Sequence, residues 1–137
     1  MEIRRLGPAD AERVRELAQR LAEAAGSPAR IEAWLADERN VAVAAFEAGQ
    51  AIGLAYGYRL PRLDERPDGL LLYSIDVVER ERRRGIGTQL IDAMRRHAPG
   101  RMWLLTNESN EAAMTLYERA GGSRPHDDDV LWTFASR

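Results

Sequence analysis

The segment Arg82-Arg83-Arg84-Gly85-Ile86-Gly87 combines three cationic side chains with two glycines, residue types that suit an anionic ligand. Glycine allows a tight turn and lets the backbone approach a ligand closely. A helix is predicted to begin at Ile86, because apolar residues from there to Met94 recur on one helical face. The first turn of such a helix presents unpaired N–H groups and the positive end of the helix dipole. Together these features indicate a binding site for a pyrophosphate or a similar anion.

The residues before this turn, from Leu70 to Val78, are predicted to form a strand, since the run is short and rich in strand-forming residues. Alternation along the strand puts Ser74 and Asp76 on the face opposite Tyr73. A carboxylate within an apolar strand is unfavourable unless it is paired or hydrated. Asp76 is therefore a candidate base or a binding group for a substrate ammonium. The alternative is a strand-end carboxylate held by a nearby arginine.

Known phosphate-binding motifs narrow the ligand by exclusion. A mononucleotide P-loop needs two glycines five positions apart followed by Lys and Ser or Thr, and this turn has neither feature. A dinucleotide fingerprint needs a third glycine where this chain has Leu90. The remaining pattern, Arg-x-x-Gly-x-Gly after a strand, is typical either of another phosphate-binding loop or of a flexible, arginine-rich surface turn.

Composition excludes several classes of function. The chain has 137 residues and a formal net charge of −2, which disfavours nucleic acid as the main partner. It has no cysteine, so disulfides, thiolate zinc sites and cysteine nucleophiles are excluded, and its two histidines are too few for a histidine-rich metal centre. The sequence shows no signal peptide and no long apolar span. We expect a soluble cytoplasmic protein in which residues 1–137 form one domain, without metal or membrane partners.

Apolar periodicity and turn residues predict the remaining elements. Asp10 is expected to cap the first helix, and Ser27 followed by Pro28 is expected to begin the second. The predicted helices cover residues 11–25, 28–35, 86–98 and 111–120. The predicted strands cover residues 2–6, 40–46, 51–60, 70–78, 102–106 and 130–135. This order predicts an α/β domain with a mixed, mostly antiparallel sheet of six to seven strands and helices on both faces.

Two motifs and the element order resemble one protein family. The segment Arg82–Gly87 resembles the acetyl-coenzyme A signature of the GNAT superfamily of N-acetyltransferases. Asn110–Gly121 resembles that family's Asn-x-x-Ala-x-x-Leu-Tyr-x-x-x-Gly segment, and the elements follow the family's order over nearly the whole chain. Residues 55–77 and 121–132 are similar to the branch of aminoglycoside 3-N-acetyltransferases. The resemblance therefore implies the GNAT fold and acetyl transfer from acetyl-CoA to an amine by direct attack in a ternary complex.

The resemblance also implies which residues bind the cofactor. The turn is expected to bind the pyrophosphate, and the end of the preceding strand is expected to pair with the pantetheine amides as an added strand would. The implied cofactor-binding residues are Ile75, Val77, Val78, Arg82, Arg83, Arg84, Gly85, Ile86, Gly87, Thr88, Asn110, Ala113 and Tyr117. Core packing remains the alternative for Ile75 and Val77, and capping of the last helix remains the alternative for Asn110.

Three residues are expected to take part in catalysis. The N–H of Val77 is the expected donor to the thioester carbonyl, as in an oxyanion hole. Tyr117 occupies the family's position for the general acid, and a phenol with a pKa near ~10 is protonated at neutral pH. Asp76 is the candidate base, although many family members deprotonate the amine through water. For Tyr117 the alternative is a core residue with its hydroxyl at the edge of the core.

Carboxylates in several loops predict a polycationic acceptor, although solvated loop charge is the alternative. The expected substrate-binding residues are Tyr56, Ser74, Asp76, Glu108, Asp127, Asp128 and Asp129. The resemblance implies the 3-amino group of an aminoglycoside as the acceptor. Another amine, such as a polyamine, an amino acid or a protein N-terminus, and a non-catalytic CoA-binding module are the alternatives. The apolar strand predicted at 130–135 also allows a homodimer, since members of this fold often pair through terminal strands.

Overall fold

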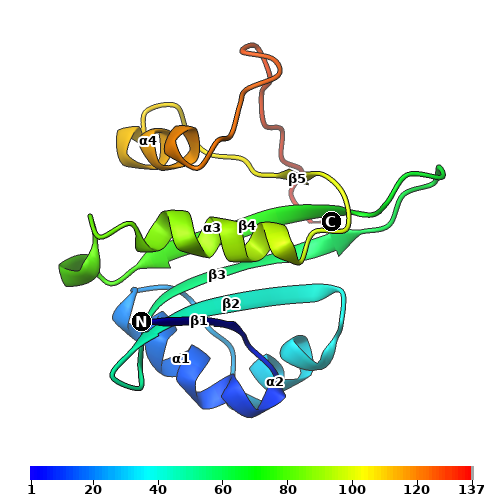
Figure 1. Cartoon of the computed structure of the whole chain (residues 1–137). Helices are drawn as coiled ribbons and strands as arrows, with labels where there is room; N and C mark the ends of the chain where they lie inside the picture. The colour runs from blue at the N-terminus through cyan, green and yellow to red at the C-terminus, as the bar shows by residue number, and fades with distance from the viewer. Residues whose placement is uncertain (137) are drawn as a thin grey trace.

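The computed structural model describes residues 1–136, which fold into a sheet flanked by helices (Figure 1). The strands are β1 (Glu2–Arg5), β2 (Asn40–Glu47), β3 (Gln50–Leu60), β4 (Gly69–Val77) and β5 (Met102–Trp103). The helices are α1 (Ala11–Arg20), α2 (Pro28–Ala36), α3 (Ile86–Arg96) and α4 (Glu111–Arg119), with short 3₁₀ turns η1 (Pro8–Asp10) and η2 (Glu79–Glu81).

The sheet has the strand order β1-β2-β3-β4-β5. Neighbours from β1 to β4 are antiparallel, whereas β4 and β5 are parallel and are joined through α3. Helices α1 and α2 cover one face of the sheet and α3 covers the other (Figure 1). The predicted mixed, mostly antiparallel sheet with helices on both faces is therefore confirmed.

The core lies around β2, which is covered on both faces. Every residue from Val41 to Phe46 is buried, so β2 is a continuous apolar run without polar alternation. The apolar face of α3 is also buried, and it includes Ile86, Leu90 and Met94 as the helical spacing predicts. Serine at the start of α2 acts as expected, because Ser27 Oγ accepts the Arg30 N–H at 3.2 Å.

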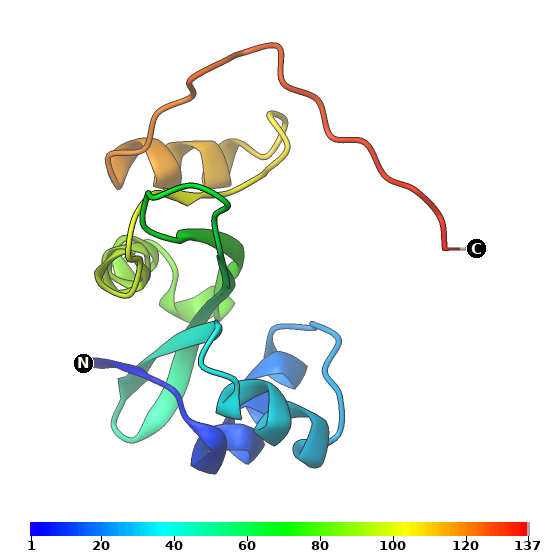
Figure 2. The same cartoon turned by 90° about the vertical axis from the view of Figure 1, so that its right-hand side faces the viewer.

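The prediction of six to seven strands is wrong, because the described chain has five. Residues 130–135 form no strand, and the side chains of Val130, Leu131, Trp132 and Phe134 are 70 to 92% exposed. Figure 2 shows this segment extending away from the sheet beyond α4. Apolar residues favour a strand only where another strand supplies hydrogen-bond partners, and this segment has none in residues 1–136.

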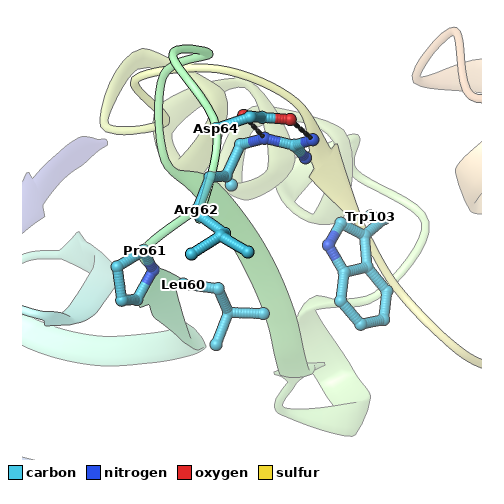
Figure 3. A pocket seen from close by; sticks show the side chains of 7 residues that line it. Leu60, Pro61, Arg62, Asp64 and Trp103 are labelled. Carbon is cyan, nitrogen blue, oxygen red and sulfur yellow. Dashed lines mark hydrogen bonds and ion pairs between the residues drawn. The ribbon is translucent and has the colours of Figure 1, made fainter.

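Strand β5 is also shorter than predicted, with two residues in place of 102–106. It was expected to be buried, but Trp103 is 40% and Leu105 is 60% exposed. The difference has the same physical cause: no strand covers the outer edge of β5 in the described chain. A shallow hollow of about 490 Å³ lies beside Trp103 (Figure 3). It is lined by Leu60, Pro61, Arg62, Leu63, Asp64, Gly69 and Trp103.

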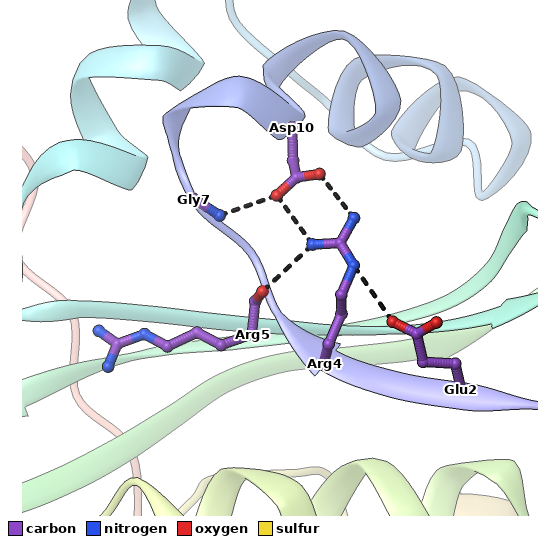
Figure 4. Close-up of polar contacts among 5 residues, drawn as sticks. All are labelled: Glu2, Arg4, Arg5, Gly7 and Asp10. Carbon is purple, nitrogen blue, oxygen red and sulfur yellow. Dashed lines mark hydrogen bonds and ion pairs between the residues drawn. The ribbon is translucent and has the colours of Figure 1, made fainter.

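Asp10 occupies the N-cap position of α1 as predicted, but its side chain forms no capping hydrogen bond with that helix. Its carboxylate accepts two hydrogen bonds from Arg4, at 2.8 and 3.1 Å, and one from the Gly7 N–H at 2.9 Å (Figure 4). The Arg4 guanidinium holds the pKa of Asp10 below its usual value, and the Gly7 N–H adds to this effect. Arg4 also lies over the ring of Phe46, at 4.6 Å from its centroid. Asp10 therefore fastens the loop before α1 to the sheet.

Helix α1 ends at Arg20, five residues before the predicted end. Ala22 adopts a left-handed conformation with φ of 56°, which ends the helix. The Ala22 N–H donates to the Gln19 carbonyl at 3.2 Å, and the Glu23 N–H donates to the Ala18 carbonyl at 2.9 Å. This pair of bonds is a Schellman motif built on alanine in place of glycine. It turns the chain toward the sheet at Glu23.

Candidate active site

The candidate site begins at the point where β4 and β5 separate. The two strands pair only at Leu70 with Met102 and at Leu71 with Trp103 in the described chain. The Val78 N–H donates to the Ile52 carbonyl of β3 at 2.9 Å. Because backbone groups alternate between the two edges of a strand, the N–H and carbonyl of Val77 face the other, open edge. The open edge of β4 therefore offers backbone hydrogen-bonding groups to a ligand.

Ile75 shares this edge with Val77, since the two residues are two positions apart. Val78 does not, because its N–H is bonded to β3 and its carbonyl accepts the Glu81 N–H at 2.9 Å. Of the three strand residues that were expected to contact a cofactor through the backbone, Ile75 and Val77 are placed to do so. The backbone of Val78 is occupied within the chain.

The backbone of Val77 is covered by two charged side chains. Its N–H donates to Asp76 Oδ1 at 2.8 Å, and its carbonyl accepts from Arg82 Nε at 2.9 Å. Arg82 Nη2 also donates to Asp76 Oδ1 at 3.1 Å. Asp76 is thus a strand-end carboxylate held by an arginine, the alternative weighed for it from the sequence. A ligand that needs the Val77 N–H must displace Asp76 from it.

The glycine turn lies directly beyond this ion pair. Arg83 and Gly85 both have positive φ, at 66° and 77°, so the chain reverses sharply before α3. A Cβ on Gly85 would meet nothing within 4 Å, which leaves the turn open on that side. The first turn of α3 contains no acidic residue, and its N–H groups have no partner within the helix. These groups, from Ile86 to Thr88, suit an anion.

The three arginines of the turn have different partners. Arg82 pairs with Asp76, and Arg84 donates to Glu47 at 2.7 Å and also to Glu81. Arg83 forms no ion pair within residues 1–136. The turn therefore presents one unpaired cation together with two that a ligand reaches only by exchanging partners.

Gly87 has a packing role that the motif alone does not reveal. A Cβ at this position would lie 3.0 Å from Leu116 Cδ1 of α4. The missing side chain lets α4 approach the first turn of α3 closely. Gly87 thereby links the turn to the helix that carries Tyr117.

The three site residues predicted at α4 and its cap, Asn110, Ala113 and Tyr117, all have structural roles. Asn110 caps the helix, because its Oδ1 accepts the Ala113 N–H at 3.1 Å. Tyr117 is half-buried against the core, and burial raises its pKa, so the phenol is protonated at neutral pH. The helix ends at Arg119, and Gly121 beyond it has φ of 91°, which lets the Gly122 N–H donate to the Tyr117 carbonyl at 2.9 Å.

An aromatic group lies on the face of the sheet that α1 and α2 cover. Tyr56 is paired with Ser74, but the next pair is Gly57 with Leu72, so Tyr73 is an extra residue in a β-bulge. The ring of Tyr73 lies 5.9 Å from that of Tyr56, centroid to centroid. Tyr73 therefore shares the face of Tyr56, and its predicted position on the opposite face is wrong, because the bulge shifts the alternation.

The bulge depends on Gly57. A Cβ at this position would lie 2.0 Å from the carbonyl oxygen of Leu71, closer than any side chain permits. Trp34 of α2 packs edge-on against the rings of Tyr56 and Tyr58, at 5.5 and 5.8 Å. Glycine thus allows the backbone arrangement that gathers these rings beside Ser74.

Glu23 belongs to this face, and sequence reasoning did not identify it. Ser74 Oγ donates to Glu23 Oε1 at 3.3 Å. Burial raises the pKa of Glu23, the charge of Asp76 raises it further, and the hydrogen bond from Ser74 opposes the rise. Periodicity placed Glu23 inside the first helix, so its turn toward β4 gave no local signal.

The predicted loop carboxylates do not join this group. Glu108 is exposed and lies 3.8 Å from Arg124. Asp127, Asp128 and Asp129 are exposed on the segment beyond α4, which Figure 2 shows extending away from the sheet. The structure brings together Tyr56, Ser74 and Asp76 but leaves these four residues apart. Sequence order alone does not determine how close such loops lie in space.

The hollow of Figure 3 lies at the opposite end of β4 from the candidate site. The hollow of Figure 3 includes Gly69, at the start of β4, whereas Val77 ends the strand eight residues later, about 26 Å away at ~3.3 Å per residue. It is therefore separate from the candidate site.

Within residues 1–136, no three acidic or histidine side chains group as metal ligands, and none of the helices has the length and apolar character to cross a membrane.

Comparison with solved structures shows a shared fold. An aminoglycoside acetyltransferase from an uncultured soil metagenomic sample, in complex with sisomicin, has a TM-score of 0.86 at 15% identity, over 99% of this chain and 95% of that chain. The aminoglycoside N-acetyltransferase AAC(6')-Iy in complex with CoA has a TM-score of 0.78 at 22% identity, over 99% of both chains. The ribosomal-protein-alanine N-acetyltransferase from Brucella melitensis biovar Abortus 2308 has a TM-score of 0.76 at 22% identity, over 96% of this chain and 98% of that chain.

Sequence comparison identifies the family. No curated protein sequence matches the chain. Residues 11–122 match the family described as the acetyltransferase (GNAT) family, which confirms the resemblance predicted from the two motifs. Because this match spans most of the chain and agrees with the fold, the protein belongs to the acetyltransferase (GNAT) family.

Proposed function

We propose that the protein is an acetyl-CoA-dependent N-acetyltransferase that acetylates a primary amine of an aminoglycoside by direct attack in a ternary complex. The observation that carries the proposal is the open edge of β4 at Val77, next to the glycine turn and the N-terminus of α3. Two solved neighbours support the substrate class, since their names are those of aminoglycoside acetyltransferases.

The residues at this edge fit acetyl-CoA. The unpaired N–H groups of Ile86, Gly87 and Thr88, the open space beside Gly85 and the unpaired Arg83 suit a pyrophosphate. The backbone of Ile75 and Val77 suits the amides of the pantetheine arm. Asn110 and Ala113 lie at the first turn of α4, the helix that packs against the glycine turn through Leu116 and Gly87. The bound cofactor would supply the acetyl thioester.

The chain's own groups would then act on the two reactants. The Val77 N–H would donate to the thioester carbonyl once Asp76 has left it, and Arg82 would exchange Asp76 for the anionic cofactor. Asp76 would then be free to accept a hydrogen bond from the acceptor amine. Tyr117 would protonate the departing thiolate, since burial keeps its phenol protonated.

The acceptor would lie on the face with Tyr56, Ser74 and Asp76. The sequence resemblance favours the 3-amino group of the aminoglycoside as the site of acetylation. The name of one neighbour carries the designation 6', so the 6'-amino group is the alternative site. A protein N-terminus is the second candidate acceptor, because another neighbour is a ribosomal-protein-alanine N-acetyltransferase. We do not include Glu108 or Asp127–Asp129 in the acceptor site, because they lie apart from it.

A thiol-release assay with acetyl-CoA would test this function. The acceptors are sisomicin, gentamicin, spermidine and a peptide with an N-terminal alanine. We expect release with the two aminoglycosides, and fragment mass spectrometry of the product to place the acetyl group on the 3-amino nitrogen. Thiol release with the peptide or with spermidine, but with neither aminoglycoside, would show that the acceptor is another amine. Absence of both thiol release and acetyl-CoA binding would exclude acetyl transfer.

We also propose that the protein forms a homodimer through the segment 130–134. The apolar side chains of this segment are largely exposed, and the outer edge of β5 has no partner strand in residues 1–136. An exposed apolar segment and an unpaired sheet edge complement one another when a second copy is present.

A further inference from the structure

The inference concerns Glu23, whose position is set by the end of α1. The left-handed residue before it is alanine, with φ of 56°, a conformation that is unfavourable for any residue with a Cβ. The turn is stabilised despite this strain by the hydrogen bond that the Glu23 N–H donates to the Ala18 carbonyl at 2.9 Å. The Glu23 carboxylate therefore points toward β4, where it accepts a hydrogen bond from Ser74, a residue 51 positions away in sequence.

The charge of Glu23 has no cationic partner in the described chain. Asp76 is neutralised by Arg82, but none of the ion pairs within residues 1–136 includes Glu23. Burial therefore disfavours the charged form of Glu23. The hydrogen bond from Ser74 replaces only part of the hydration that the carboxylate loses on burial. A half-buried carboxylate without a cation is stabilised when a cationic ligand binds.

The surroundings of Glu23 suit an ammonium group. Ser74, which bonds to Glu23, is paired across the sheet with Tyr56, and the charge of Glu23 contributes to the raised pKa of Tyr56 after burial. The ring of Tyr73 lies 5.9 Å from that of Tyr56, and the Tyr73 side chain is largely exposed. Aromatic faces attract cations, so rings beside a carboxylate favour an amine over a neutral ligand.

We propose that Glu23 is an acceptor-binding residue, which holds an ammonium group of the acceptor with Ser74 orienting its carboxylate and the rings of Tyr56 and Tyr73 alongside. This inference rests on the proposed acetyl transfer and identifies its acceptor class as amines with a second cationic group. The ammonium held by Glu23 is then distinct from the amine that reacts near Asp76, two residues further along β4.

The test compares Glu23→Gln with Glu16→Gln as the matched control, because Glu16 is an exposed glutamate of α1, the helix that precedes Glu23. We expect Glu23→Gln to raise the KM for sisomicin and spermidine at least tenfold, with the KM for acetyl-CoA unchanged. Calorimetric titration of the same two amines into the CoA-bound protein should show the same loss of affinity without any need for turnover. The Glu16→Gln variant should match the wild type in every measurement.

Thermal melting separates binding from a structural role. If Glu23 only supports the fold, its replacement lowers the melting temperature and raises both KM values. If it binds the acceptor, Glu23→Gln melts at or above the wild-type temperature, because the buried charge is gone. Unchanged affinity for both amines in Glu23→Gln, or no binding of either amine to the wild type, would overturn the inference. Amine binding that depends on Glu23 without thiol release would instead refute the acetyl transfer and keep the site.

Discussion

At the scale of single residues, the proposed reaction requires side chains to exchange hydrogen-bond partners. Asp76 is bound to both Arg82 and the Val77 N–H, so these three groups satisfy one another within the chain. Such a state avoids an unpaired charge or donor while no ligand is bound. Tyr117 and Glu23 differ from them, because neither forms an ion pair within residues 1–136 and burial is the largest cause of the raised pKa of each.

Replacement of Tyr117 by Phe tests the proton donor. We expect kcat to fall about 10² to 10⁴-fold, the usual contribution of general acid–base catalysis, because the thiolate would leave without a proton. The ring remains in place, so the KM for acetyl-CoA and the melting temperature should stay at wild-type values. Steady-state kinetics measure both parameters. An unchanged kcat would remove Tyr117 from the reaction and leave it a packing residue.

Replacement of Ser74 by Ala tests the carboxylate of Glu23 through pH. The serine hydroxyl lowers the pKa of Glu23, while burial and Asp76 raise it, so its loss should raise that pKa further. The facing groups are Tyr56 on β3 and Asp76 with Arg82 beside β4. Binding of the acceptor needs the charged carboxylate, so affinity should fall as the pH is lowered through the pKa of Glu23. Because that pKa is higher in Ser74→Ala, the variant should lose affinity at a higher pH than the wild type. Calorimetry across pH 4 to 8 checks this, and an unshifted profile in Ser74→Ala would contradict it.

At the scale of elements, two local irregularities assemble the site. The left-handed Ala22 ends α1 early and turns Glu23 toward the sheet, and the bulge at Tyr73 moves that ring onto the face of Tyr56. Neither a regular helix nor a regular strand would bring these side chains together. Bulges recur near active sites because they re-aim side chains in this way.

The bulge predicts a steric requirement at Gly57. A Cβ there would lie 2.0 Å from a backbone oxygen, which no rotamer change relieves. We expect Gly57→Ala to destabilise the fold by about 3 kcal/mol or more in urea unfolding. Gly7→Ala is the control, because a Cβ at Gly7 would meet nothing within 4 Å. Equal unfolding midpoints for the two variants would show that the bulge is not tightly packed.

At the scale of the whole molecule, the sheet is incomplete at one edge. The segment 130–134 holds four large apolar side chains in solvent, and β5 has only two residues paired with β4. An apolar surface of this kind is a common sign of an interface. The same segment was predicted as a strand of the sheet, so its composition agrees with pairing on a second copy.

Charge introduced into this segment tests the homodimer. We expect the wild type to have the mass of a dimer in light scattering, and the double variant Trp132→Glu, Phe134→Glu to have the mass of a monomer. Ser123→Glu, on the exposed chain between α4 and the apolar segment, is the control and should remain dimeric. A monomeric wild type would contradict the proposal, as would a double variant that is still a dimer.

Local patterns in the chain were sufficient to predict α3, α4, the β2–β3 hairpin and the glycine turn. Their apolar spacing, caps and glycines act over a few residues, so they are readable without tertiary contacts. The family also followed from such patterns, since both motifs lie within single turns or helices. Asp76 was identified as an unusual carboxylate for the same reason.

Contacts between distant segments decided the rest. Glu23 meets Ser74 only because α1 stops at Arg20, and Arg82 covers Asp76 only because the turn folds back on β4. Residues 130–135 have the composition of a strand but no edge within the described chain on which to pair. Hydrogen-bond partners, register and charge neutralisation depend on which segments meet in space, and no periodicity along the chain contains that information.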